Sequence, residues 1–299
     1  MSRIKGWRAL WVVPFLLLAG TAMAREASVQ VEAVQAPAWV ERGAQRLPLV
    51  AGQFLKSRDR VVTGRDARVL LRLSEGSAVK LGENASLRMD ALGQRQGGVF
   101  TAAFDVAKGA FRFTTGVFNR FQNRRAVNVR IATVTAGIRG TDLWGSSDAE
   151  RDLVCLIEGR ITVTHPDAEP VLMSEPLSFY VAPKGQVPQP VAAVDPDQLA
   201  KWAQETEIQP AAATFRNQGR WQVYLGVVGS ELEALALYDQ VRAAGYPVRI
   251  RPEAAGDGSY QYALLVPQIT TQEGAETLAA RLRQELGSIM GSATPRAQR

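Results

Sequence analysis

Cysteine and histidine are almost absent from this chain of 299 residues, which contains one of each, Cys155 and His165. A single cysteine excludes an intramolecular disulfide, so hydrophobic cores must stabilise the fold. Metal sites built from cysteine and histidine are excluded by the same count, and the sequence predicts no metal site and no cofactor. Cys155 lies inside the apolar run "DLVCLIEG", where a buried and unreactive thiol is expected rather than a nucleophile.

Long apolar runs are also scarce, and the one that stands out is near the N-terminus. Residues 1–24 combine a basic start, a short apolar run and small residues, which is typical of a cleaved secretory signal peptide. An uncleaved anchor would need roughly 20 apolar residues, and no later run is long enough to span a membrane. We therefore expect a periplasmic protein that begins at Arg25. The basic start is Arg3, Lys5 and Arg8, the apolar run is Ala9–Ala19, and the small residues are Ala22-Met23-Ala24.

The net charge is mild, and nucleic acid is not expected as a partner because a secreted protein rarely meets it. The sequence holds 35 basic and 29 acidic residues, and loss of the three basic residues of the leader leaves 32 against 29, or +3. We interpret the densest basic stretch, "FNRFQNRRAVNVR", as a solvated loop and strand, with an anionic envelope polymer as the alternative partner. Its arginines and phenylalanines are Arg120, Arg124, Arg125, Arg130, Phe118 and Phe121.

Residues 39–183 show hydrophobic side chains at every second position, which is typical of β-strands. Tight turns such as Glu75-Gly76 and Glu83-Asn84 separate the runs, and no segment of helical period interrupts them. We expect an all-β domain, either a sandwich or a short β-solenoid. The residues expected to face its core are Val69, Leu71, Leu73, Val79, Leu81, Leu87, Met89, Phe111, Phe113, Val127, Val129, Ile131, Ile161 and Val163.

Four motifs in this region occur in the order typical of FecR-type domains. They are Thr63-Gly64, Glu75-Gly76-Ser77, Gly109 and Arg139-Gly140-Thr141. Residues 39–183 therefore resemble a FecR-type domain, with Glu75 in place of the usual aspartate and Val134 in place of the usual proline. The resemblance implies a scaffold, or a surface that binds another envelope protein, because such domains are similar to the exported parts of iron-uptake signal transducers.

The motif Arg139-Gly140-Thr141 is interpreted as part of the architecture. Gly140 permits a backbone conformation or a close approach that a side chain forbids, and Thr141 can restart a strand. Arg139 has donors suited to turn carbonyls or to a carboxylate such as Asp142. Recognition of an anionic ligand is the alternative. No general base or nucleophile accompanies the arginine, so the sequence does not predict an enzyme.

Residues 184–219 are predicted to be a linker that contains one short helix. The stretch "PKGQVPQPVAAVDPDQ" is rich in proline, and Asp195 followed by proline is a typical helix start. Leu199 and Trp202 share one face of that helix, and we expect this face to dock on the β domain. The stretch "QPAAATFRNQG" is expected to be flexible, with a domain boundary near Gly219.

Residues 220–294 nearly repeat a unit of one strand and one helix. The repeat and the strand "PVRIR" between its two halves predict a βαββαβ module of ferredoxin-like type, with both helices on one face of the sheet. The last strand has little β signal. The first helix is expected to start at Ser230, to bury Leu232, Leu235, Ala236 and Val241, and to end at Gly245; the second is expected to start at Thr270, to bury Ala275, Leu278, Ala279 and Leu282, and to end at Gly287.

This module resembles a SPOR domain, a small peptidoglycan-binding module of bacterial envelope proteins. The matching residues are Trp221, Val223, Gly226, Tyr260 and Pro267. Two positions depart from the family, because Tyr224 replaces a frequent glutamine and Tyr262 replaces a frequent arginine. The resemblance implies a non-catalytic protein that holds peptidoglycan glycan strands, and the alternative is a periplasmic sensory or regulatory protein related to FecR-type transducers.

The glycan site is predicted on the face of the sheet that the helices leave open. Strand alternation places Tyr224 on that face. If the faces of the strands align, Tyr260 and Tyr262 lie beside it, with Arg249 at one side. Flat rings would contact sugar faces, and the guanidinium would bind carboxylates.

The leader generates a first testable prediction. The protein isolated from a periplasmic extract should begin at Arg25, because the small residues at 22–24 satisfy a signal peptidase. Mass spectrometry of the intact protein checks this directly. A cytoplasmic pool that retains Met1 as its only form would contradict the assignment.

Overall fold

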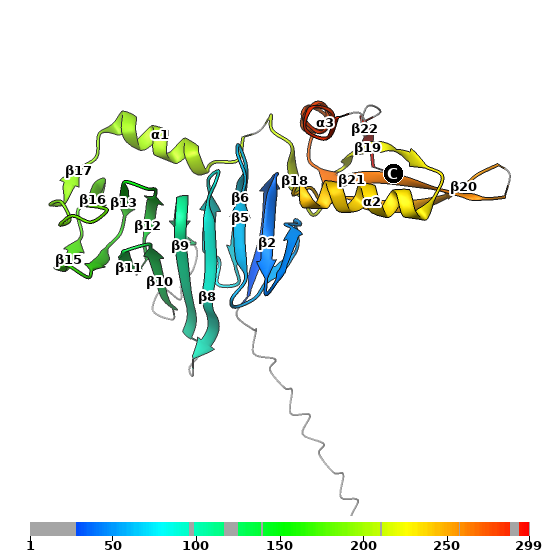
Figure 1. Ribbon diagram of the computed structural model, residues 1–299. Helices are drawn as coiled ribbons and strands as arrows, with labels where there is room; N and C mark the ends of the chain where they lie inside the picture. The colour runs from blue at the N-terminus through cyan, green and yellow to red at the C-terminus, as the bar shows by residue number, and fades with distance from the viewer. Residues whose placement is uncertain are drawn as a thin grey trace, which may run out of the picture.

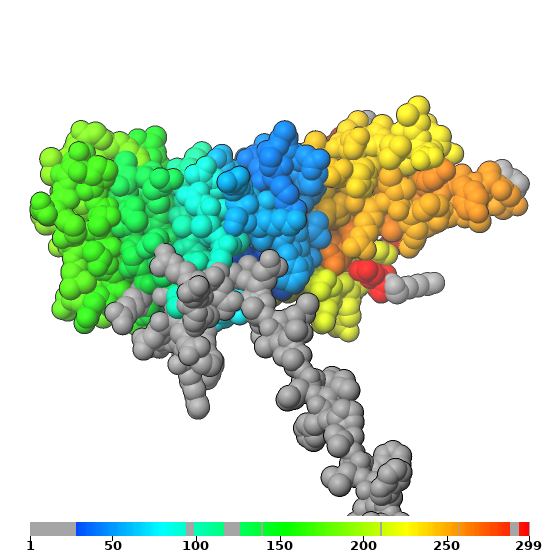
Figure 2. Space-filling view, turned by 90° about the horizontal axis from the view of Figure 1, so that it is seen from below, coloured from blue at the N-terminus to red at the C-terminus, as the bar shows by residue number. Residues whose placement is uncertain are grey.

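The computed structural model describes residues 28–95, 99–116, 125–138, 140–209, 211–256, 258–287 and 293–298. Strands dominate it, and three helices, α1 to α3, accompany them. The β domain, formed by β1 to β17, lies at one end of an elongated molecule, and a C-terminal module lies at the other (Figures 1 and 2). The predicted leader at 1–24 lies outside the described residues.

Two sheets form the β domain, and the long strand β9 (Val99–Thr114) belongs to both. Sheet A contains β1 (Val29–Gln35), β4 (Phe54–Leu55), β6 (Arg68–Leu73), β7 (Ala78–Leu81), the second half of β9, β12 (Asp142–Ser147), β13 (Arg151–Glu158), β16 (Ser178–Pro183) and β17 (Ala192–Ala193). Sheet B contains β3 (Gln45–Pro48), β2 (Ala38–Arg42), β5 (Arg60–Thr63), β8 (Ser86–Arg95), the first half of β9, β10 (Arg125–Ile131), β11 (Val134–Ile138), β14 (Ile161–His165) and β15 (Ala168–Met173).

One hydrophobic core fills the space between the sheets. Every residue that the alternation assigned to this core is buried, and none of them is more than 1% exposed. The alternating pattern therefore identified the inner face of these strands correctly. β1 lies before residue 39, where the β domain was expected to start. The alternation did not indicate this strand because a bulge between Val31 and Ala33 interrupts it.

The helix α1 (Pro196–Thr206) confirms the predicted short helix and its docking face. The Asp195 side chain accepts hydrogen bonds from the backbone N–H groups of Asp197 and Gln198, at 2.9 and 3.2 Å. Trp202 stacks on Trp144 of β12, with ring centroids 4.9 Å apart and planes 9° from parallel. Figure 1 shows α1 lying across the strands of sheet A. The helix thus covers an outer apolar patch of the β domain.

The short strand β18 (Thr214–Arg216) joins the two halves of the molecule. It pairs with β1 on one side, and Phe215 pairs with Ile269 of the C-terminal module on the other. The prediction of a flexible stretch is wrong here, since Phe215 is fully buried. Three residues are too few to show a period in the sequence.

The C-terminal module follows in the order β19 (Trp221–Val228), α2 (Glu231–Ala243), β20 (Arg249–Ala254), β21 (Tyr260–Ile269), α3 (Gln272–Leu286) and β22 (Thr294–Ala297). β21 lies between β20 and β19, and β22 pairs with the outer edge of β19. Val223 and Leu225 of β19 are buried in the core beneath the helices.

The apolar side of α2 was predicted incorrectly. Leu232 and Leu235 are 79% and 45% exposed, and Ala236 is exposed as well. Val241 is buried as predicted, and Ala234, seven residues before it, faces the core in place of the other three. Apolar residues occur on both sides of this helix, so the sequence allowed either phase. The predicted cap Ser230 and the glycine ending at Gly245, with φ +89°, are confirmed.

The second helix agrees with its prediction except at its start. The four residues expected to be buried, Ala275, Leu278, Ala279 and Leu282, are at most 1% exposed. The N-cap is Thr271 rather than Thr270, and its hydroxyl oxygen accepts a hydrogen bond from the Gly274 N–H at 3.0 Å. The Thr270 N–H instead donates to the Thr214 carbonyl of β18. Gly287 ends the helix, as predicted.

Docking of α1 can be tested through Trp202. We expect Trp202→Ala to lower the free energy of unfolding by about 3 kcal/mol, because a stacked and buried indole is removed. Leu232→Ala is the control, since this side chain is exposed and should cost less than about 0.5 kcal/mol. Urea unfolding followed by tryptophan fluorescence and circular dichroism measures both. Equal effects of the two substitutions would contradict the docked helix.

Candidate functional site

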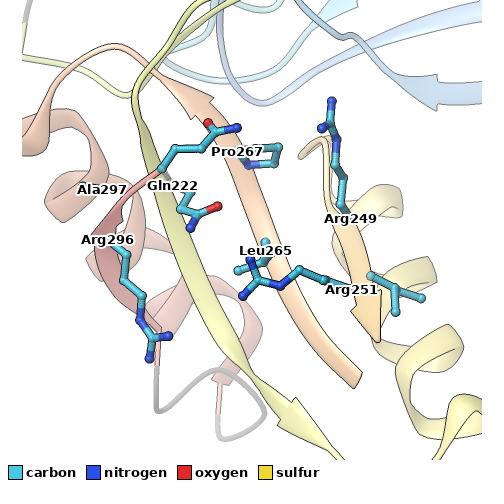
Figure 3. Close-up of a pocket in the computed structure, with 9 residues that line it drawn as sticks. Gln222, Arg249, Arg251, Leu265, Pro267, Arg296 and Ala297 are labelled. Atoms are coloured by element: carbon cyan, nitrogen blue, oxygen red, sulfur yellow. The ribbon is translucent and has the colours of Figure 1, made fainter. Parts of the chain in front are cut away.

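A groove of about 910 Å³ lies on the face of the C-terminal sheet opposite the helices. Figure 3 shows its side chains, which come from four strands and the residue after β22. The polar side chains that line it are Gln222, Arg249, Arg251, Arg296 and Gln298. Its apolar lining is Ile250, Leu265, Pro267 and Ala297. The groove therefore combines guanidinium and amide groups around a small apolar floor.

Strand register places the cations of β20 over the middle strand. Arg249 lies opposite Leu265, and Arg251 lies opposite Ala263. Residues directly opposite in an antiparallel pair point to the same side of a sheet. On the other side of β21, Tyr224 lies opposite Leu265. Tyr224 and Arg249 consequently share one face, as the sequence predicted.

The charges of the groove are only partly compensated. Arg251 forms an ion pair with Glu253 at 2.6 Å, and the Arg296 guanidinium lies 3.6 Å from the centroid of the Tyr224 ring. Within the part of the chain that the structure describes, no carboxylate pairs with Arg249 or with Arg296. These two groups are free to bind an anion, and the ring of Tyr224 is held flat beneath one of them.

Tyr260 and Tyr262 do not belong to this face, which corrects the predicted site. Tyr262 lies opposite Pro252 and shares its side of β21 with Leu264, which is buried in the core. Tyr262 packs against that core, and Tyr260 is 64% exposed on the same side. The run "ALLV" at 263–266 is apolar on both parities, so alternation could not assign the faces of this strand.

Arg296 and Gln298 are polar groove residues that sequence reasoning missed. Arg296 lies on β22, which begins at the end of the stretch "SIMGSATP" with its weak β signal and extends beyond the expected limit of the module at 294. β22 is fixed by its partner, because Gln222 lies opposite Arg296 and Trp221 opposite Ala297. Nothing local in the sequence indicates that pairing.

The motif at 139–141 has a structural environment where it is described. Arg139 lies outside the described residues. Thr141 is buried and donates its hydroxyl to the Arg160 carbonyl at 3.0 Å, and Gly140 has φ +67°. A side chain on Gly159 would come within 2.4 Å of the Gly140 carbonyl oxygen, so this crossing requires glycine. Asp142 is held by two hydrogen bonds from Arg112, at 2.7 and 2.9 Å.

The predicted basic stretch is largely outside the described residues, which include neither 117–124 nor the side chain at 125. Arg130, on the outer face of sheet B, forms an ion pair with Asp105 at 2.5 Å and a longer one with Asp90 at 3.7 Å. Its neighbour Arg88 contacts the same two carboxylates. This part of the surface therefore compensates its own charge.

Cys155 is fully buried, as predicted. Burial raises the pKa of its thiol to about 12, with a smaller contribution from the Asp142 carboxylate. Among the described residues, no three histidine, cysteine, aspartate or glutamate side chains come together as metal ligands. In the described ranges no helix is both long and apolar enough to cross a membrane.

Two family models match the chain. The FecR protein model matches residues 59–162, and the SPOR domain model matches residues 217–291. The chain therefore contains a FecR domain and a C-terminal SPOR domain, and the groove lies in the second. No curated protein matches the sequence significantly.

Solved structures are distantly similar. Two crystal structures of a candidate anti-sigma factor from Parabacteroides distasonis ATCC 8503, at 1.65 and 2.50 Å resolution, have a TM-score of 0.40 and 12% identity to this chain. The matched regions cover 76% of this chain and 92% and 91% of theirs.

The buried thiol gives a further prediction. At pH 8 the native protein should resist alkylation by iodoacetamide, because a pKa of about 12 keeps the thiol protonated and its burial blocks access. The protein in urea provides the control, and there Cys155 should react fully. Rapid labelling of the folded protein would show that the thiol is exposed.

Proposed function

We propose that this protein is a non-catalytic protein of the bacterial periplasm that binds peptidoglycan glycan strands in the groove of its SPOR domain. The observation that supports this most directly is the position of Arg249, Arg296 and Tyr224 together on the open face of the segment that matches the SPOR model. A periplasmic location is supported by the leader-like sequence at 1–24. We further propose that the C-terminal module has the ferredoxin-like βαββαβ arrangement.

The groove has the chemistry that a glycan with N-acetyl groups and lactyl carboxylates requires. Arg249 and Arg296 supply charged donors for carboxylates. Gln222 and Gln298 supply amide donors and acceptors for acetamido groups and hydroxyls. Leu265 and Pro267 offer apolar surface to the flat faces of sugar rings, and the Tyr224 ring supports the Arg296 guanidinium that lies over it. A site of this kind holds a polymer without cutting it.

The β domain is proposed to be a scaffold or a surface for another envelope protein. Limits of 39–183 for this domain, 184–219 for the linker and 220–294 for the SPOR-like part remain predictions. The FecR match at 59–162 favours one alternative function, a periplasmic regulatory protein whose β domain contacts a signalling partner. If glycan binding is the function, its loss should remove the activity of the protein in cells. If regulation through a signalling partner is the function, the activity should persist without glycan binding.

Binding should depend on Tyr224, which lies on the open face of the sheet with the groove, and not on Tyr260, which lies on the other side. We expect the double variant Tyr224→Ala, Arg249→Gln to lower affinity for purified sacculi by at least about tenfold, because the ring that supports Arg296 and one charged donor are lost. Tyr260→Ala is the matched control, and it should bind as the parent does. Co-sedimentation with sacculi measures each affinity.

Circular dichroism should first show that all three proteins are folded. A double variant that binds as tightly as the parent would overturn the proposed site. A Tyr260→Ala protein that loses binding would place the glycan on the helix side of the sheet instead.

A further inference from the structure

We propose that the glycan site does not end at the SPOR domain but continues onto the β domain, so that both domains bind the same glycan strand. This inference rests on the proposed function. The β domain contributes Leu47 and Pro48 of β3, together with Val50 and Gln53 of the following loop. The ligand of this extended site is a peptidoglycan glycan that is longer than the SPOR groove alone accommodates.

The first observation is continuity. A second groove, of about 350 Å³, lies between the two domains and shares Arg249 and Pro267 with the first. In Figure 3 the Arg249 side chain extends from β20 toward the N-terminal strands drawn in blue. A glycan strand that leaves the first groove past Arg249 therefore enters the second directly, because both grooves are lined by this arginine and by Pro267.

The second observation is that the junction is fixed by hydrogen bonds and close packing. The Trp39 indole N–H donates to the Ala243 carbonyl at 3.2 Å, where α2 ends. A side chain on Gly245 would come within 2.8 Å of the Trp39 ring, so helix α2 sits directly against β2. Arg281 of α3 donates to the Ala36 carbonyl and pairs with Asp66 at 3.5 Å. The two walls of the second groove are thus held at a set separation.

The third observation is a strained bulge where the grooves meet. Gln268 has φ +68°, a left-handed conformation that residues with a side chain rarely adopt. β21 gains one residue relative to β19 between Val266 and Ile269. This bulge orients Pro267 toward both grooves and Gln268 toward the second. Bulges of this kind are frequent beside binding sites, where they redirect side chains.

The chemistry of the second groove repeats that of the first. Leu47, Pro48 and Val248 provide apolar contact, and Gln53 and Gln268 provide amides. Arg242 lies 4.9 Å from the centroid of the Tyr238 ring, so a cation and a ring again occur together. The described residues that line this groove include no carboxylate. A neutral or anionic sugar is therefore accepted, and an anion is not repelled.

Gln53→Glu in the full chain tests the continuation. The Gln53 side-chain oxygen accepts a hydrogen bond from the Val50 N–H at 3.3 Å, and a carboxylate preserves this bond while it removes the amide donor and adds negative charge. Gln186→Glu, in an exposed loop of the β domain outside both grooves, is the control for charge. Arg251→Gln reports on the first groove alone.

Binding is measured by calorimetry with soluble glycan strands that carry no peptides. One preparation contains strands of four sugars, and the other contains strands of at least ten. We expect Gln53→Glu to weaken binding of the long strands by about tenfold and to leave the short ones unchanged. Gln186→Glu should match the parent, and Arg251→Gln should weaken both lengths.

If Gln53→Glu binds long strands as the parent does while Arg251→Gln is impaired, the continuation is wrong and the proposed function stands. Equal losses for both lengths in Gln53→Glu would also overturn the continuation. If the parent binds neither length, the proposed function itself fails.

Discussion

The pairing of β18 with strands on both of its sides is the interaction on which the arrangement of the molecule depends. Three residues between the modules add one strand to β1 and touch β21, so sheet A continues from the FecR domain into the SPOR domain. Phe215 is fully buried at this point and belongs to the same hydrophobic core as residues of both modules. The connection that the sequence predicted to be a linker is thus part of sheet A and of the hydrophobic core.

The junction limits how the domains can move because it is made of backbone groups and not only of side chains. The Thr270 N–H donates to the Thr214 carbonyl, and the Ala38 N–H donates to the Gly245 carbonyl, at 3.0 and 3.4 Å. Separation of the modules would expose Phe215 and Trp39 contacts and leave these backbone groups to be satisfied by water. Domains with small polar interfaces are expected to move freely relative to each other. The interface here instead combines buried side chains, strand pairing and a close contact at Gly245. A rigid junction holds the β-domain wall of the second groove at a fixed position beside the SPOR groove.

The sequence predicted the elements whose pattern is local and repeated. Alternation identified the inner residues of the β domain, and the capping signals at Asp195 and Ser230 placed two helices. It failed where one signal supports two answers: apolar residues lie on both sides of α2, and "ALLV" is apolar on both faces of β21. It also failed where an element is defined by its partner, as with β18 and β22. Register and bulges, which decide that Tyr262 faces the helices and Tyr224 does not, are properties of pairs of strands and cannot be found in one strand.

A distance between the far ends of the two modules tests the rigid junction most directly. Spin labels at Leu172 and Leu232, both exposed, on a Cys155→Ala background, report that distance by pulsed electron resonance. A rigid junction should give one narrow distance distribution, and substitution of Phe215 by aspartate should broaden it. A broad distribution in the otherwise unchanged protein would show that the domains move independently, and it would contradict the continuous sheet.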